Sequence, residues 1–137
     1  MKGTVIIAAV DRAVAANSGW YTLPTFDERF PYGLRSAPGP EVQLKQSMGK
    51  ELIVLLGALD NSASAGGHLR TTREAMRQGP GRRQRGEYFM ATAKREASER
   101  GVDLRWRTTV VSDVGHNYRE MASAAATILY GHPQDDE

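Results

Sequence analysis

Short runs of apolar residues along the chain predict four strands. Residues 4–10 (TVIIAAV) and 51–58 (ELIVLLGA) are almost continuously aliphatic, which is typical of parallel strands buried on both faces. Residues 104–112 (LRWRTTVVS) alternate at first and then become apolar, so they predict another strand. Residues 12–20 (RAVAANSGW) are small and apolar, and we expect a strand or the end of one there.

Helical spacing and capping residues predict four helices, over residues 41–48, 69–78, 82–100 and 117–130. Gly79-Pro80-Gly81 separates the second helix from the third. Gly101 is expected to end the third helix, and Asn117 to cap the fourth. In the third helix an apolar stripe is expected to face the core, formed by Tyr88, Phe89, Ala93 and Ala97. Its charged residues are expected to lie mostly outward: Lys94, Arg95, Glu96, Glu99 and Arg100.

Residues 21–40 are rich in proline and aromatic residues and predict a long loop that packs on the rest of the protein. The chain therefore alternates between strands and helices, and such an order predicts an α/β fold with a mainly parallel sheet covered by helices. A length of 137 residues fits one domain, residues 1–137. Within it, we expect residues 132–137 to form a flexible acidic tail.

Composition narrows the chemistry that the chain can perform. It has no cysteine, which excludes disulfides, thiolate metal ligands and a cysteine nucleophile. The longest apolar run is far shorter than the ~20 residues that a membrane span needs. The N-terminal residues also lack the length of a secretory signal. We therefore expect a soluble, cytoplasmic protein that does not bind a membrane.

Arginines are concentrated in one part of the chain. Six of them lie between residues 70 and 85 with a single acid among them: Arg70, Arg73, Arg77, Arg82, Arg83 and Arg85. Such a stretch is typical of a nucleic-acid-binding surface or of an ordinary solvated face. No aromatic residue alternates with these arginines to stack on bases, so the second interpretation is favoured.

An acid and a histidine follow two of the predicted strands. Asp60 comes after residues 51–58, and His116 comes after residues 104–112. In open parallel sheets, functional groups collect beyond the carboxyl ends of the strands. An acid there can orient an imidazole that moves a proton. The alternatives are a turn or helix cap for Asp60 and a surface histidine for His116.

The segments VLLGALD and GVDLRWRTTVVSDVGHNYREMASAAATILYG resemble the C-terminal half of a bacterial α/β-hydrolase of the serine esterase or lipase type. RAVAANSGWYTLPTFDERFPYGL is similar to the segment that follows the nucleophile elbow in that family, so the resemblance covers residues 11–131. It implies that Asp60 and His116 correspond to the acid and the histidine of the family's catalytic triad, and it implies a truncated α/β-hydrolase-like core.

The chain departs from the family pattern at the nucleophile. The family's serine lies on a G-x-S-x-G elbow that precedes the acid, and no such motif precedes Asp60 here. We therefore expect a scaffold truncated before the elbow, in which residues 1–10, with their predicted strand, are unlike the family. Ser64, in the sequence SASAGG, is a candidate nucleophile. The other interpretation is that this segment is a flexible loop that happens to contain serines.

A divalent metal such as zinc or manganese is a second route to activity. Asp60, His68 and His116 provide one carboxylate and two imidazoles, which is the ligand set of a catalytic site with a place left for water. A metal there would lower the pKa of bound water toward ~7 and supply a nucleophile. The alternative is that His68 is an ordinary loop residue.

Three functions follow from these features. The first is hydrolysis of a small carboxylic or phosphate ester, with Asp60 and His116 activating water directly or through a metal. The second is a catalytically inactive remnant that only dimerises, and the third is an arginine-rich nucleic-acid-binding module. Because half of a parallel sheet leaves an exposed edge, we also expect a homodimer that covers this edge.

Overall fold

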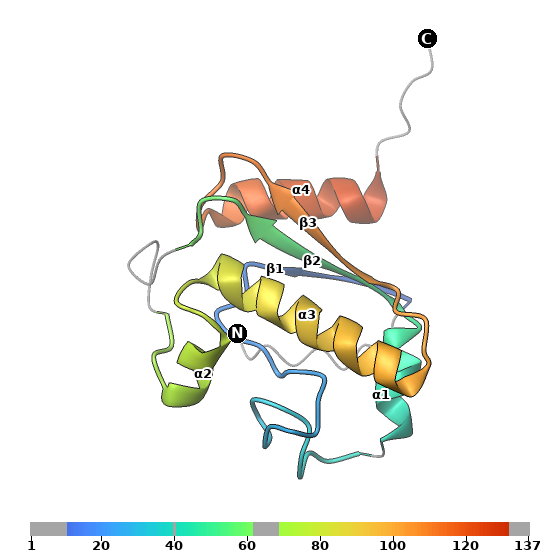
Figure 1. Ribbon diagram of the computed structural model, residues 1–137. Coiled ribbons are helices and arrows are strands. Elements are labelled where there is room, and N and C mark those ends of the chain that lie inside the picture. The colour runs from blue at the N-terminus through green and yellow to red at the C-terminus, as the bar shows by residue number, and fades with distance from the viewer. Residues whose placement is uncertain (1–10, 40, 62–68, 132–137) are drawn as a thin grey trace.

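The computed structural model describes residues 11–39, 41–61 and 69–131. Three parallel strands, β1 (Arg12–Ala16), β2 (Glu51–Gly57) and β3 (Trp106–Val111), form a sheet in the order β1-β2-β3. The helices are α1 (Val42–Met48), α2 (Arg73–Gln78), α3 (Arg82–Arg100) and α4 (Tyr118–Tyr130). Helices α3 and α4 cover opposite faces of the sheet (Figure 1). The predicted α/β class with a parallel sheet is confirmed.

The central strand β2 is buried on both faces, as its continuous apolar sequence predicts. Leu52, Val54 and Leu56 join the larger core cluster, which also contains Phe89 and other residues of α3. Leu55 points the other way and packs with residues of α4 and of the loop before it. Successive side chains of a strand point to opposite faces, so one apolar run supplies both layers of the core.

Most predicted boundaries agree with the structure to within two residues. The third helix has the predicted bounds, and Gly101 ends it in the left-handed conformation, with φ +65°. Asn117 caps α4 by accepting hydrogen bonds from the backbone N–H groups of Arg119 and Glu120. Helix α2 begins four residues later than predicted, because Thr72 is its N-cap and accepts from the backbone N–H of Ala75. The predicted strand over residues 4–10 lies outside the described residues.

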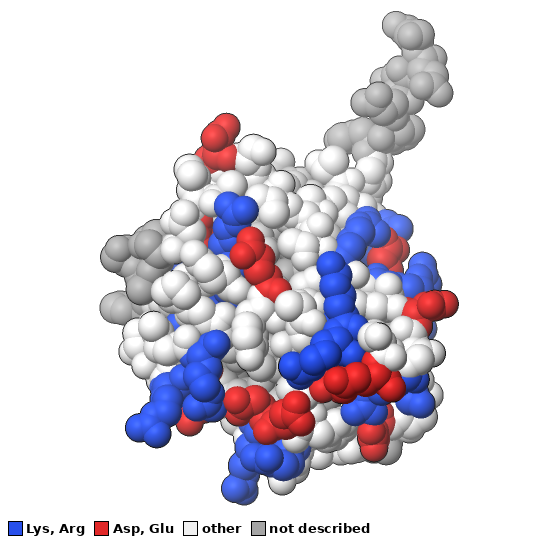
Figure 2. Space-filling view, viewed as in Figure 1, with Lys and Arg blue, Asp and Glu red and all other residues white. Residues whose placement is uncertain are grey.

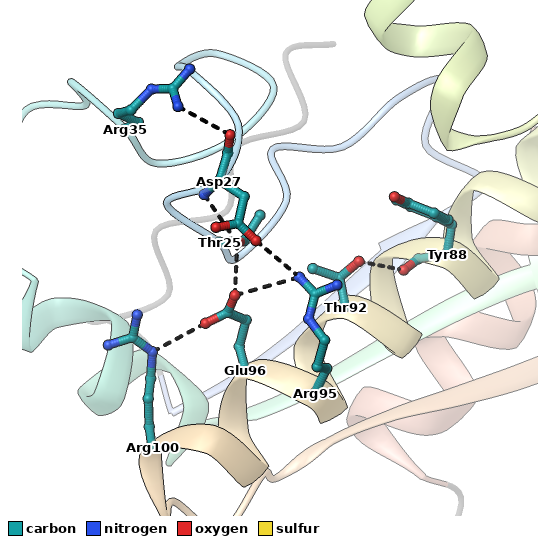
Figure 3. Close-up of polar contacts among 8 residues, drawn as sticks. All are labelled: Thr25, Asp27, Arg35, Tyr88, Thr92, Arg95, Glu96 and Arg100. Atoms are coloured by element: carbon teal, nitrogen blue, oxygen red, sulfur yellow. Dashed lines mark hydrogen bonds and ion pairs between the residues drawn. The ribbon is translucent and has the colours of Figure 1, made fainter.

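The predicted long loop between β1 and α1 packs on α3. Tyr21 is buried and stacks on the ring of Phe89 at 4.8 Å between ring centroids. Thr25 donates a hydrogen bond of 2.7 Å from its hydroxyl to the carboxylate of Glu96, which also pairs with Arg95 and Arg100 (Figure 3). These contacts fix a segment that has little regular secondary structure of its own.

Two positions on α3 differ from the predicted helix faces. Glu96 was expected to point outward, but it is only 5% exposed because it accepts the hydrogen bond from Thr25. Helical spacing predicts that Tyr88 belongs to the apolar stripe, but its side chain is 45% exposed, and of this pair only Phe89 is buried in the core. The buried face of α3 therefore includes a charged residue that binds the long loop.

The arginine-rich stretch does not form a single basic surface. Arg82 and Arg85 are buried, and Arg77 and Arg83 pair with Glu28 and Glu87. On the face shown in Figure 2, Lys and Arg side chains lie beside Asp and Glu side chains. The expectation of a uniformly solvated arginine face is wrong for Arg82 and Arg85, and their burial removes two of the six cations proposed to bind nucleic acid.

No helix in the described ranges is both long and apolar enough to span a lipid bilayer. The predicted acidic tail over residues 132–137 lies outside those ranges, as do residues 1–10, which are expected to differ from the family.

Candidate functional site

The carboxyl ends of the three strands lie at one edge of the sheet, because all three strands are parallel. Asn17 follows β1, Asp60 follows β2 by three residues, and His116 follows β3 by five. The structure brings the side chains of Asp60 and His116 together, although 56 residues separate them in the sequence.

Asp60 is fully buried in a tight turn after β2. Its backbone N–H donates to the carbonyl of Gly57, and its own carbonyl accepts from the backbone N–H of Arg83. Carboxylate oxygen Oδ2 lies 3.1 Å from Nδ1 of His116, and Oδ1 lies 3.5 Å from Nη1 of Arg82. A buried carboxylate is costly unless it is paired. Here Oδ2 has the contact with His116, whereas Oδ1 makes no hydrogen bond within the described residues and has only the longer ion pair with Arg82.

His116 lies in the loop between β3 and α4, which is anchored on both sides of it. The carbonyl of Val114 accepts from the backbone N–H of Leu59 at 2.9 Å, and Asn117 caps the next helix. The His116 side chain is 37% exposed, whereas that of Asp60 is 0% exposed. With Nδ1 turned toward Asp60, Nε2 is the ring nitrogen available to exchange a proton with a substrate or with water.

Asn17, which the sequence analysis does not predict as a site residue, connects the strand ends to the loop that carries His116. Its side-chain oxygen accepts from the backbone N–H of Gly57, and its side-chain nitrogen donates to the carbonyl of Gly115 at 3.2 Å. It adopts a left-handed conformation with φ +42°, which asparagine tolerates better than most residues. The sequence feature that could have predicted this role is the position of Asn17, an asparagine that directly follows an apolar strand.

Tyr21 also lies near the acid, but it is unsuited to act as a base. Burial is the main reason that the pKa of Tyr21 rises to about 12, and the negative charge of Asp60 adds to the rise. The phenol is therefore protonated at neutral pH. It contributes to packing through its stack on Phe89.

Two of the predicted site residues belong to a segment, residues 62–68, that lies outside the described part of the chain. These are Ser64, the candidate nucleophile, and His68, the candidate third metal ligand. Across residues 11–39, 41–61 and 69–131, no three His, Cys, Asp or Glu side chains gather as a metal site would require. The metal set of Asp60, His68 and His116 stays a prediction.

The solved structures that are similar to the chain include two bacterial hydrolases. A poly(aspartic acid) hydrolase-1 from Sphingomonas sp. KT-1 is 38% identical, with a TM-score of 0.82, over 87% of this chain and 45% of that protein. A poly(3-hydroxybutyrate) depolymerase from Bordetella parapertussis is 34% identical, with a TM-score of 0.79, over 87% of this chain and 40% of that protein. The chain thus spans less than half the length of either structure. No protein-family model and no curated protein matches it.

Proposed function

We propose that this chain, whose α/β-hydrolase-like fold is shared with two solved hydrolase structures, hydrolyses ester-type substrates through Asp60 and His116. One observation carries the proposal: Oδ2 of the buried Asp60 lies 3.1 Å from Nδ1 of the partly exposed His116. An acid that orients an imidazole in this way leaves the opposite nitrogen as a general base.

In the proposed reaction, Nε2 of His116 takes a proton from a water molecule as the water oxygen attacks the carbonyl carbon of the ester. The bond between that carbon and the alcohol oxygen then breaks, and the imidazolium returns the proton to the departing alkoxide. Asp60 stabilises the imidazolium while it carries the proton. A carboxylic ester suits this route better than a phosphate ester, because a phosphate centre needs added positive charge to stabilise its transition state.

A metal-assisted route is the alternative for the same pair. A divalent ion on Asp60 would have to compete with Arg82 and His116, which already face its two oxygens. His68 would have to complete the ligand set. Activation of water by His116 without a metal therefore has the stronger support from the described contacts.

The experiment measures hydrolysis of p-nitrophenyl acetate and p-nitrophenyl phosphate by the purified chain, with and without prior chelation. We expect turnover of the acetate to fall about 100-fold or more in His116→Ala and in Asp60→Asn, which is the usual size of a general-base contribution. Asp113→Asn is the matched control, because Asp113 is an exposed acid of the same loop and asparagine tolerates its left-handed backbone.

Each further outcome selects another function. Activity that is lost on chelation and restored by zinc or manganese would support the metal route. Activity that survives chelation but is lost in Ser64→Ala would support a serine nucleophile. If the folded wild-type chain turns over neither ester, the proposal fails and the inactive dimerising remnant is favoured.

A further inference from the structure

Arg82 contacts the carboxylate oxygen of Asp60 that His116 does not use. Its Nη1 lies 3.5 Å from Oδ1, while Nδ1 of His116 lies 3.1 Å from Oδ2. The Arg82 side chain is 5% exposed and that of Asp60 is 0% exposed. Arginine side chains are rarely buried without a partner, and the carboxylate of Asp60 is an oppositely charged partner of the buried Arg82 side chain.

The position of Arg82 on its helix supports the same conclusion. Arg82 is the first residue of α3, whose first turn contains no acidic residue. A cation is disfavoured at a helix N-terminus, because the helix dipole is positive there. Asp60 supplies the negative charge that offsets this unfavourable placement.

The start of α3 also contacts the backbone of the Asp60 turn. The backbone N–H of Arg83 donates to the carbonyl of Asp60 at 2.8 Å. A Cβ atom on Gly81 would come within 2.5 Å of the carbonyl carbon of Asn61, so these two segments approach each other closely. Arg82 is therefore held at a fixed place relative to the acid.

The other buried arginine of this helix has different partners. Arg85 donates to the carbonyls of Gly79 and Gly19 at 2.8 and 2.7 Å, and it contacts the sulfur of Met76. It ties the segment after β1 to the end of α2. Of these two buried arginines, Arg82 is the one that forms an ion pair with Asp60.

We propose that Arg82 is a positioning residue for the Asp60–His116 pair: its positive charge beside Oδ1 favours the rotation of the carboxylate in which Oδ2 faces Nδ1. Without the ion pair at Oδ1, the carboxylate plane turns more freely and the hydrogen bond to His116 is less well aligned. The imidazole then spends less time with Nε2 directed toward the substrate. The catalytic part of this inference rests on the proposed function, whereas the orientation of His116 can be measured without turnover.

The test compares Arg82→Met and Arg82→Lys, with Arg83→Met as the matched control. Arg83 lies on the same helical turn, but its side chain binds the carbonyl of Ala58 and Glu87. In ¹⁵N-labelled protein, the Nδ1–H proton of His116 should give a downfield resonance that His116→Gln abolishes. We expect Arg82→Met to broaden or remove this resonance in folded protein, Arg82→Lys to retain part of it, and Arg83→Met to leave it unchanged.

On the ester substrate, Arg82→Met is expected to lower kcat by about 10- to 100-fold, the scale that misplacement of a catalytic group produces, while KM stays within about twofold. If Arg82→Met does not fold, Arg82→Gln, which keeps donors without the charge, takes its place. A folded Met or Gln variant with an unchanged His116 resonance would overturn the proposal. If the wild type shows no turnover, the proposed function fails but the resonance still decides the role of Arg82.

Discussion

The side-chain oxygen of Asn17 accepts a hydrogen bond of 2.9 Å from the backbone N–H of Gly57. The same carboxamide donates to the carbonyl of Gly115, the residue before His116. One side chain therefore connects the ends of β1 and β2 to the loop that carries the histidine. The three segments lie so close together that a residue larger than glycine at position 57 would clash with the backbone before His116.

We expect Gly57→Ala to destabilise the protein by about 1–3 kcal/mol, as overpacking of a tight site does. A Cβ atom at this position would lie 2.5 Å from the carbonyl oxygen of Val114 and 2.7 Å from that of Gly115. Denaturation in urea measures the loss. Gly19→Ala is the matched control, because a Cβ there meets nothing within 4 Å, and it should change stability by less than about 0.5 kcal/mol. Equal stability of the two variants would contradict the close approach.

Removal of the buried glutamate of α3 is expected to loosen the long loop. Glu96→Ala deletes the acceptor of the 2.7 Å hydrogen bond from Thr25, and a bond to a charged group contributes about 1.5–3 kcal/mol. Limited proteolysis should then cut within residues 22–35 sooner than in the wild type. Glu99→Ala, an exposed acid of the same helix, should leave both stability and cleavage unchanged. Similar behaviour of the two variants would rule out this anchoring role.

The ion pairs of Glu51 predict a stability that depends on pH. Hydrogen bonds from Arg12, and then from Arg107, hold the pKa of Glu51 below its ordinary value. Because the folded state favours the charged form, this contribution is present at neutral pH and is lost as pH falls through the folded-state pKa. The urea midpoint of Glu51→Gln should therefore lie below that of the wild type at pH 7, with a smaller gap at pH 3. An equal gap at both pH values would contradict this, and Asp103→Asn, an exposed acid, serves as control.

The homodimer also remains a prediction. Within the described ranges, the outer edges of β1 and β3 have no strand partner, and open edges favour pairing with another chain. Sedimentation equilibrium should then give twice the 15.0 kDa mass of the chain. Val110 on β3 is 43% exposed. The charged side chain in Val110→Lys should therefore dissociate a dimer that pairs through the edge of β3, whereas a dimer that pairs through the edge of β1 should stay intact. A monomer at tens of micromolar would refute the expectation.

The sequence predicts best those features whose causes lie within a few residues. The apolar run of β2, the spacing of α3 and the end of that helix at Gly101 are local signals, and all of them were confirmed. The approach of Asp60 to His116 follows from the general behaviour of parallel sheets, so the sequence could predict that these two residues form a pair.

Features that depend on distant partners were missed. The burial of Glu96 depends on Thr25, which is 71 residues away, and helical spacing alone places Glu96 among charged neighbours. Arg82 was grouped with the other arginines, because its relation to Asp60 exists only once α3 packs against the turn after β2. Asn17 likewise has no role until Gly57 and Gly115 approach it.

The parallel register of the sheet has a consequence for how the chain folds. The central strand β2 pairs with partners that lie far away in sequence, as in Arg12 with Glu51 and Leu52 with Trp106. Each pairing requires closure of a long loop, and proteins dominated by such distant contacts fold more slowly than helical ones of similar size. During synthesis, the apolar segment of β2 leaves the ribosome well before β3 has been made. Until then its apolar side chains and unpaired backbone groups stay accessible to other chains, and we expect this interval to be the one in which the nascent protein most needs protection from aggregation.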